Sequence, residues 1–440
     1  MDAETRRVVE AMNPWWREGR SLEGEIRARL PATYVPRRLR DRLGPLWGSA
    51  NKAHLVVGPR QAGKTTFLWK HLVETGGRIL FLNAEDPRIR AWCRSAAVFL
   101  EDLARGLGPV EAIFLDEAQH LDEPGLFVKG LVDLRPGCPI FVTGSSAFHL
   151  HARTRESLAG RATRATLLPF GALELLPPAG ESPRLTWRAE ARRVAERLAR
   201  TGGYPEVWTA AEPEAILELL VQAFLSRDAS DAFRIRRPDA MRRLLPLAAG
   251  QVGNLVNIAE WASILGVSRD TVAEYCEILE GAHLIRRVPV FAGGKRAELT
   301  ASSKVYFLDN GFRNRVLGDL GPLETRSDRG ALLESWVFTE LTKARPEGEP
   351  VRYWRTRSGA EVDFVLDDPG GLTGLEVKAG AMSAPRLSRS ARSFIEAYGP
   401  RTFWVLNDTL EAEETLHGTR IRWAPFEGWL EELGTSGNGR

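Results

Sequence analysis

A glycine-bounded loop with a lysine and two threonines stands near the start of the chain, GPRQAGKTT at residues 58–66. Glycines at both ends let the backbone turn its N–H groups toward phosphate oxygens, and the dipole of a following helix adds positive charge. Lys64 is expected to contact the β- and γ-phosphates of ATP, and Thr65 to offer its hydroxyl to Mg²⁺. The expected nucleotide contacts are Gly58, Pro59, Arg60, Gln61, Ala62, Gly63, Lys64, Thr65 and Thr66.

Two adjacent carboxylates follow the apolar segment AIFL at residues 112–115. A buried parallel strand that ends in a carboxylate would bring Asp116 to the Mg²⁺ beside the phosphate loop. Glu117 would then orient and deprotonate the attacking water. The alternative for each carboxylate is a surface turn residue. The order of loop, strand and carboxylates favours ATP binding over that alternative.

Hydroxyl and guanidinium groups further along the chain complete this candidate site. The segment PIFVTGSS ends in hydroxyls, and Ser145 is the preferred sensor of the γ-phosphate, ahead of Thr143. In SLAGRATRA, Arg161 is preferred over Arg164 as an arginine finger that a neighbouring subunit supplies. The competing interpretation is a surface arginine in an arginine-rich chain. A finger that acts in trans requires a homo-oligomer, either a ring or a dimer.

A second set of acidic residues lies toward the C-terminus, within a pattern of one helix, three strands, a helix and a strand. Glu376 and Lys378 share one face of a strand because side chains alternate along it. Asp363 and Glu376 are candidate ligands of Mg²⁺ or Mn²⁺, and Lys378 would position a water for attack on a phosphodiester. Glu334 would support this site from the helix, and Glu361 is a candidate accessory ligand. A surface cluster of salt bridges is the alternative.

Residues 255–310 have the pattern of two helices followed by a hairpin, which is the layout of a winged helix. Ser268 is placed to cap the second helix. Candidate DNA contacts lie at the start of that helix and on the hairpin loop: Arg269, Thr271, Lys295 and Arg296. Asp270 and Glu274 on the same helix would repel phosphates, so a protein-binding or purely structural role stays open.

Several kinds of structure must position these residues. Short apolar runs between residues 52 and 170 predict a parallel sheet covered by helices on both faces. The expected organisation is a helical region at 1–48, a P-loop ATPase core at 49–172 and a helical lid or linker at 173–248. A winged helix at 249–312, a carboxylate-bearing domain at 325–410 and a tail at 411–440 would follow.

Composition limits the class of protein. The chain has 440 residues, of which 43% are hydrophobic, and its net charge of +3 neither requires nor excludes nucleic acid. The three cysteines are far apart and indicate neither a disulfide framework nor a structural zinc site. The N-terminus lacks an apolar signal region, and no apolar run is long enough to span a bilayer. A cytoplasmic protein without a membrane partner is therefore expected.

The segments GPRQAGKTT, FLDEAQ, TGSSA, SLAGR and GGYPEV together resemble AAA+-related ATPases of bacteria and archaea that carry a C-terminal domain of unknown function. The resemblance covers roughly residues 50–380 and implies an ASCE-type P-loop domain, a winged helix and a restriction-endonuclease-like fold. The set Glu334, Asp363, Glu376 and Lys378 resembles that of the PD-(D/E)xK nucleases. The implied fold class is α/β: a P-loop NTPase (AAA+-like) parallel sheet with a helical segment, a winged helix-turn-helix and a restriction-endonuclease-like αβββαβ domain.

Three functions are compatible with these motifs. The first is an ATPase acting on DNA, in which turnover is coupled to a DNA-binding winged helix and a nuclease-like domain that cleaves DNA. The second is a motor or remodeller of branched DNA that does not cleave. The third is an ATP-dependent regulatory switch that works through protein partners.

Overall fold

The computed structural model describes residues 1–144, 158–226, 235, 237–293 and 303–436. Three residues proposed as functional, Ser145, Lys295 and Arg296, lie outside the described residues. The chain divides into two compact units. Unit 1 is Met1–Leu168 with Gly281–His283, and unit 2 is Pro169–Glu280 with Leu284–Arg440. Each unit has its own main sheet.

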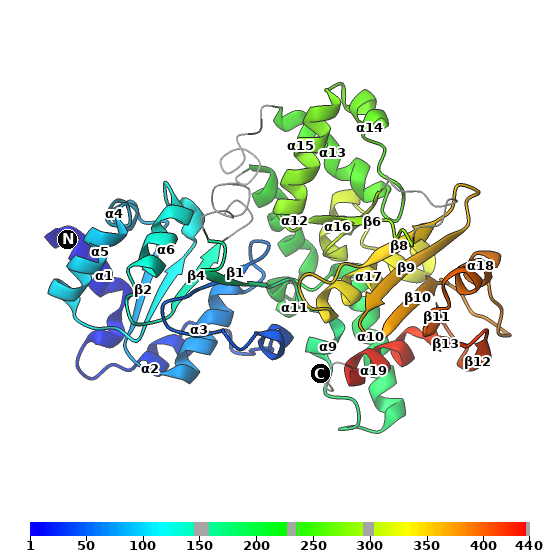
Figure 1. Cartoon of the computed structure of the whole chain (residues 1–440), viewed down its shortest axis with the longest axis horizontal. Helices are drawn as coiled ribbons and strands as arrows, with labels where there is room; N and C mark the ends of the chain where they lie inside the picture. Colours follow the sequence, from blue (N-terminus) through cyan, green and yellow to red (C-terminus); the bar gives the residue numbers. More distant parts are fainter. Residues whose placement is uncertain (145–157, 227–234, 236, 294–302, 437–440) are drawn as a thin grey trace. The chain divides into compact units, whose positions relative to one another are not determined.

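Unit 1 contains a five-stranded sheet in which every neighbouring pair is parallel. Its strands stand in the order β2-β3-β4-β1-β5, so β4 lies between the strand before the phosphate loop and the strand that ends in Asp116 (Figure 1). The apolar runs predicted as buried strands form four of the five. The strands are β1 (Ala53–Val57), β2 (Ile79–Asn83), β3 (Ala112–Asp116), β4 (Ile140–Gly144) and β5 (Ala162–Thr166).

Helices cover both faces of this sheet, as the continuous apolar strands predicted (Figure 1). Successive strand residues point to opposite faces, so Leu55 and Val57 belong to one hydrophobic core and Val56 to another. The first core includes residues of α1, α4, α5 and α6, and the second includes residues of α2 and α3. The helices are α1 (Ala3–Met12), α2 (Leu22–Arg27), α3 (Lys64–Thr75), α4 (Pro87–Trp92), α5 (Ala96–Asp102) and α6 (Pro124–Asp133).

The N-terminal segment pairs with the edge strand β2. The Asn13 side chain donates to the carbonyl oxygen of Phe81 at 2.9 Å and accepts from its backbone N–H at 2.7 Å. The indole N–H groups of Trp15 and Trp16 both donate to the carbonyl oxygen of Ile79 at 3.0 Å. Side chains thus satisfy backbone groups that an edge strand otherwise leaves unpaired.

The first helices of unit 2 pack closely at Gly202 and Gly203, where there is no room for a side chain. A Cβ at Gly202 would lie 2.1 Å from Asp309 Oδ1, and a Cβ at Gly203 would lie 2.1 Å from the carbonyl oxygen of Phe170. Asp309 accepts from the backbone N–H of Gly203 at 2.7 Å and caps α16 through Phe312. The GGYPEV motif is therefore a packing motif. The helices are α9 (Ala172–Leu175), α10 (Arg184–Thr201), α11 (Pro205–Thr209), α12 (Pro213–Ala223), α13 (Pro238–Gly250) and α16 (Asn310–Leu317).

A helix-turn-helix and a two-stranded antiparallel sheet follow α13 in the chain. Helix α14 (Ile258–Leu265) ends at Gly266 in a left-handed conformation, and α15 (Arg269–Gly281) begins after Ser268. The Ser268 hydroxyl accepts from the Thr271 backbone N–H at 3.1 Å, as predicted for a capping residue. Strands β6 (Ile285–Pro289) and β7 (Ser303–Phe307) pair with each other. This is the order of elements expected of a winged helix.

The C-terminal sheet has six strands in the order β12-β13-β11-β10-β9-β8. Helix α17, strands β8, β9 and β10, helix α18 and strand β11 reproduce the predicted αβββαβ order. Residues 411–440, treated as a tail from the sequence, instead supply β12, β13 and α19. The elements are α17 (Arg329–Ala344), β8 (Arg352–Arg355), β9 (Glu361–Asp368), β10 (Gly371–Val377), α18 (Arg389–Tyr398), β11 (Thr402–Asn407), β12 (Ala412–Leu416), β13 (Thr419–Pro425) and α19 (Phe426–Ser436).

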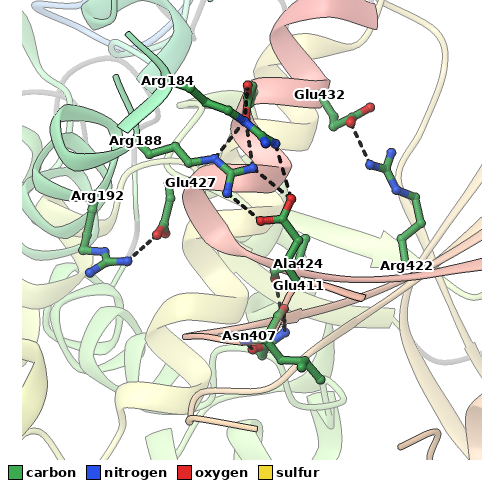
Figure 2. A network of polar contacts seen from close by, with 11 residues as sticks. Arg184, Arg188, Arg192, Asn407, Glu411, Arg422, Ala424, Glu427 and Glu432 are labelled. Carbon is green, nitrogen blue, oxygen red and sulfur yellow. Dashed lines mark hydrogen bonds and ion pairs between the residues drawn. The ribbon is translucent and has the colours of Figure 1, made fainter. Parts of the chain in front are cut away.

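An arginine-rich face of α10 forms ion pairs with Glu411 and with two glutamates of α19. Figure 2 shows Arg188 directed toward Glu411 and Arg192 directed toward Glu427. Arg188 Nη1 lies 2.6 Å from Glu411 Oε2, and the same side chain pairs with Glu431 at 2.9 Å. The network joins α10 to α19. Within the described residues, no helix combines the length and apolar composition needed to cross a membrane.

Candidate functional site

The phosphate loop connects the end of β1 to the start of α3. Gly58 has a φ of 147°, and a Cβ there would lie 2.0 Å from the carbonyl oxygen of Leu167, so the close approach requires glycine. Gly63 precedes α3 in a left-handed conformation, with a φ of 91°. Lys64 is buried, and its ammonium group donates to the carbonyl oxygens of Gly58 at 3.2 Å and Pro59 at 2.9 Å. The positive charge therefore lies within the loop predicted to hold phosphates.

The hydroxyl of Thr65, at the start of α3, contacts the carboxylate of Asp116, at the end of β3. Thr65 Oγ1 donates to Asp116 Oδ1 at 2.8 Å, although 51 residues separate them in the chain. Thr143, at the end of β4, donates to the same carboxylate oxygen. Its hydroxyl also accepts the backbone N–H of Glu117 at 2.9 Å. Thr143 was the second choice for a sensor of the γ-phosphate. Its contacts in the structure are instead with Asp116 and with the backbone of Glu117, so it helps to position both residues.

The electrostatics of this site favour a cation. Burial raises the pKa of Asp116 to about 6, while the hydrogen bond from Thr143 opposes the shift. The nearby charge of Lys64 also opposes the shift but does not cancel it. A buried carboxylate and a hydroxyl at hydrogen-bond distance are oxygen ligands of the kind that Mg²⁺ prefers. These residues therefore fit a Mg²⁺ ion bound with a nucleotide.

Glu117 occupies a constrained position directly after β3. Its φ is 52°, in the left-handed region that a non-glycine residue seldom adopts. The backbone N–H is anchored by Thr143, and the carboxylate accepts from the side-chain amide of Gln119. Such strain is common at functional positions, where the surrounding contacts hold the backbone.

Arg37 is a contact of the phosphate loop that the sequence did not single out. It is buried and comes from the N-terminal segment PRRLRDR. Its Nη1 donates to the carbonyl oxygen of Ala62 at 2.9 Å, and its Nη2 donates to that of Leu168. One guanidinium therefore connects the phosphate loop to the segment after β5, which makes Arg37 a positioning residue.

Replacing Thr143 by valine tests how the two carboxylates are held. Valine has the same branched shape but lacks the hydroxyl that bridges Asp116 and the Glu117 backbone. We expect kcat for ATP to fall about tenfold, as for loss of roughly 1.4 kcal/mol of positioning. Steady-state kinetics should place the loss in kcat rather than KM, and Thr143→Ser should recover most of it. An unchanged kcat in the valine variant would contradict this role.

Arg161 lies far from the phosphate loop of its own chain. Its carbonyl oxygen accepts the backbone N–H of Ala53, the first residue of β1, whereas the loop follows the last residue of that strand. Its side chain pairs with Asp133 at 2.7 Å and is 38% exposed. An accessible guanidinium at this end of the sheet is compatible with the predicted role in trans and not with a role in cis.

The predicted C-terminal residues lie on α17, β9 and β10, with Lys378 directly after β10. The backbone N–H of Val377 donates to Asp363 Oδ2 at 2.8 Å, which joins β10 to Asp363 on β9. Lys378 Nζ lies 3.3 Å from Glu376 Oε1. Burial raises the pKa of Asp363, and the charge of Glu334 raises it further. Four residues read from the sequence as one set are therefore neighbours, while Glu361 is on the same strand as Asp363.

A lysine that the sequence did not indicate enters this acidic cluster. Lys304 on β7 is 2% exposed, and its ammonium group lies 2.5 Å from Glu361 Oε1 and 3.3 Å from Glu334 Oε1. Tyr306, two residues along the same strand, donates its hydroxyl to Glu334. Burial alone would lower the pKa of Lys304, but the charges of Glu334, Asp363 and Glu361 raise it.

The cluster does not fit a divalent metal ion as arranged here. Lys304 already supplies a positive charge to Glu334 and Glu361, the supporting residue and the candidate accessory ligand of the predicted metal site. The part of the chain that the structure describes contains no group of three or more His, Cys, Asp or Glu side chains placed to hold one. Asp363 and Glu376 are neighbours, and their role as metal ligands remains a prediction.

The second helix of the winged-helix-like segment presents acidic residues to solvent. Arg269 is exposed, as a DNA contact would require. Thr271 is half-buried and its hydroxyl is bonded to that of Ser268 at 2.8 Å, so it is poorly placed for a base contact. Glu274 is exposed together with two further acidic residues at helical spacing, Asp270 and Glu277. Much of this helix surface would repel DNA phosphates.

The strand order and the loop chemistry define a class. A phosphate loop after β1, a carboxylate pair after β3 and an intervening β4 make unit 1 a P-loop ATPase domain of the ASCE type. Residues 50–176 match a family described as an AAA domain. Residues 192–322 and 329–425 match two domains of unknown function, DUF8612 and DUF4143.

The similarity to relatives extends over most of the chain. Uncharacterized protein Rv2008c of Mycobacterium tuberculosis is 34% identical over 349 residues, which cover 77% of this chain and 72% of the relative. Uncharacterized protein MJ1544 of Methanocaldococcus jannaschii is 26% identical and covers 72% of each chain. The chain therefore belongs to this family of AAA+-related ATPases.

Solved structures are similar at a much lower level. The structure of AMPPCP-bound DnaA from Aquifex aeolicus matches 55% of this chain and 85% of its own, at 14% identity and a TM-score of 0.22. That score is too low to establish a common arrangement of the whole chain.

Proposed function

We propose that the chain binds ATP with Mg²⁺ and hydrolyses it, and that this turnover acts on DNA through unit 2. The hydrogen bond between Thr65 and Asp116, beside the buried ammonium of Lys64, carries the proposal for ATP. A hydroxyl, a carboxylate and a lysine converge at the carboxyl end of a parallel sheet, where α/β proteins bind nucleotides.

Each residue of the site has a definable task. Lys64 would exchange its contacts with loop carbonyl oxygens for the β- and γ-phosphates, and the loop N–H groups would hold the phosphate oxygens. Mg²⁺, when bound, supplies positive charge that stabilises the developing negative charge of phosphoryl transfer. Glu117 would accept the proton of the attacking water, and the bond of its backbone N–H to Thr143 would keep its carboxylate in position. Arg37 would stabilise the conformation of the phosphate loop through its hydrogen bond to the carbonyl oxygen of Ala62.

Arg161 would complete a neighbouring subunit's site rather than its own. We expect Arg161→Ala to lower ATP turnover about a thousandfold, the lower range for loss of an arginine finger. Mixing this variant with Lys64→Ala should restore turnover, because the first supplies an intact phosphate loop and the second an intact Arg161. Turnover measured on the mixture is the decisive quantity. Full activity of Arg161→Ala alone, or no recovery on mixing, would contradict a finger in trans.

The proposal for DNA depends on unit 2. A helix-turn-helix precedes a two-stranded sheet, and Arg242, Arg243 and Arg269 are exposed. Phosphate contacts by such arginines would make DNA affinity fall with salt, with a log-log slope near −0.9 for each contact. Lys295 and Arg296 are the candidate contacts of the hairpin loop.

Two observations favour the alternative functions. Lys304 in the acidic cluster favours a motor or remodeller that grips DNA without cutting it. The acidic surface of α15 favours a protein partner and hence a regulatory switch. Cleavage by Asp363, Glu376 and Lys378 with Mg²⁺ or Mn²⁺ is the remaining alternative.

One experiment separates these functions. ATP turnover and strand scission are measured on the full chain with single-stranded, duplex and branched DNA, in Mg²⁺ and in Mn²⁺. DNA-stimulated turnover without scission in either metal supports the motor, and scission lost in Asp363→Ala supports the nuclease. Turnover that DNA does not change supports the switch. A chain that does not hydrolyse ATP at all would overturn the proposal.

A further inference from the structure

The acidic cluster of the C-terminal domain contains its own cation. Lys304 comes from β7, outside the αβββαβ elements, yet its ammonium contacts Glu361 on β9 and Glu334 on α17. The same group lies 5.5 Å from the ring centre of Tyr353 on β8, within the range of a cation–π contact. Three elements of the C-terminal domain thus surround one lysine head group.

The neighbouring strand residue strengthens this arrangement. Tyr306 shares a face of β7 with Lys304, because side chains two residues apart point the same way. Its hydroxyl donates to the Glu334 oxygen that Lys304 also contacts. One carboxylate oxygen of Glu334 is therefore saturated by two donors from β7, which leaves it a poor ligand for a metal ion.

Protein cations balance most of the acidic charge. The cluster contains four carboxylates, those of Glu334, Glu361, Asp363 and Glu376. Within the described residues, all of them except Asp363 have a lysine or arginine within ion-pair distance. Arg355 pairs with Glu361 at 2.9 Å in addition to Lys304, and Lys378 pairs with Glu376 at 3.3 Å. A divalent ion would have to enter beside a buried ammonium that cannot move into water without leaving these contacts.

We propose that Lys304 is the built-in counter-ion of this cluster and takes the place that a divalent cation would occupy, so that the C-terminal domain binds no catalytic metal while β7 is in place. The ammonium joins the winged-helix-like segment to the C-terminal domain through Glu334 and Glu361, and its charge also acts on Asp363, one of the two candidate metal ligands. The inference does not depend on ATP hydrolysis or on DNA binding.

Removing the charge should create a metal site. In Lys304→Met the side chain keeps much of its length, but the carboxylates lose their buried cation and repel one another. We expect this variant to melt at a lower temperature than the wild type and to recover stability in millimolar Mn²⁺. Titration of Mn²⁺ without nucleotide, followed by the electron spin resonance of the free ion, should give at least tenfold tighter binding than in the wild type.

Matched variants identify the site of binding. Lys304→Arg keeps the charge and should behave as the wild type, while Lys304→Met combined with Asp363→Asn should lose the gained Mn²⁺ affinity. A folded Lys304→Met protein, judged by circular dichroism, that gains no Mn²⁺ affinity would overturn the proposal. If that variant does not fold, the wild type still decides. If the wild type binds Mn²⁺ and Glu376→Gln removes that binding, the proposal is equally overturned. If the wild type shows no Mn²⁺ binding that depends on Glu376, the proposal is supported.

Discussion

Lys64→Ala should lose ATP binding almost completely. The wild-type ammonium is buried and held within the loop by two carbonyl oxygens, so it would exchange these contacts for phosphate oxygens with little further ordering. Its loss removes charge-assisted hydrogen bonds to two phosphates, each worth about 1.5–3 kcal/mol. Summed conservatively to about 3 kcal/mol, this predicts a Kd for ATP at least about a hundredfold weaker. Isothermal titration calorimetry measures the change directly.

The matched control for this variant is on the same helix. Lys70 is 41% exposed and pairs with Glu74 on the surface of α3. Lys70→Ala removes an equal charge from the same helix and should change the Kd less than twofold, because exposed pairs contribute little. ATP affinity retained within a few-fold in Lys64→Ala would refute the assignment of the phosphate loop.

Glu117→Gln should separate binding from hydrolysis. Glutamine has nearly the same shape but cannot accept the proton of the attacking water, and general-base catalysis contributes roughly 10²–10⁴-fold to rates. We expect kcat to fall by about that factor while the Kd for ATP changes little. The backbone contact with Thr143 does not involve the side chain, so the strained turn should persist. Single-turnover hydrolysis and ATP titration of the same preparation provide both quantities.

A carboxylate after the neighbouring strand provides the comparison. Glu85 follows β2 and is 57% exposed, with His120 at 3.7 Å. Glu85→Gln makes the same chemical change close to the sheet and should leave kcat within twofold. Normal turnover in Glu117→Gln would assign the base to another residue.

That the phosphate loop and the two carboxylates lie together could be predicted from the sequence because local rules determine it. Buried parallel strands appear as apolar runs, and the residues after their carboxyl ends meet at one edge of the sheet. That reasoning located Lys64, Thr65, Asp116 and Glu117. Alternation of side chains placed Glu376 and Lys378 on one face of a predicted strand, and the structure shows that this strand, β10, pairs with β9, which carries Asp363.

Contacts between distant elements could not be read from the sequence. Arg37 stands in a run with Arg38 and Arg40, and nothing in that run indicates that Arg37 is buried while Arg40 is 60% exposed. Lys304 lies in a segment recognisable as a strand, but its burial depends on which domain covers that strand. The tail predicted for residues 411–440 missed β12, which is short and polar and whose partner β13 comes later in the chain.

The pairing of Asn13, Trp15 and Trp16 with β2 bears on how this ATPase can be divided experimentally. A shortened chain starting at residue 49 would retain every predicted nucleotide contact but would lose Arg37 and expose an unpaired backbone along one side of the sheet. Such a fragment is expected to self-associate through that side. Modular exchange of the ATPase domain between relatives should therefore take the first 48 residues along with it.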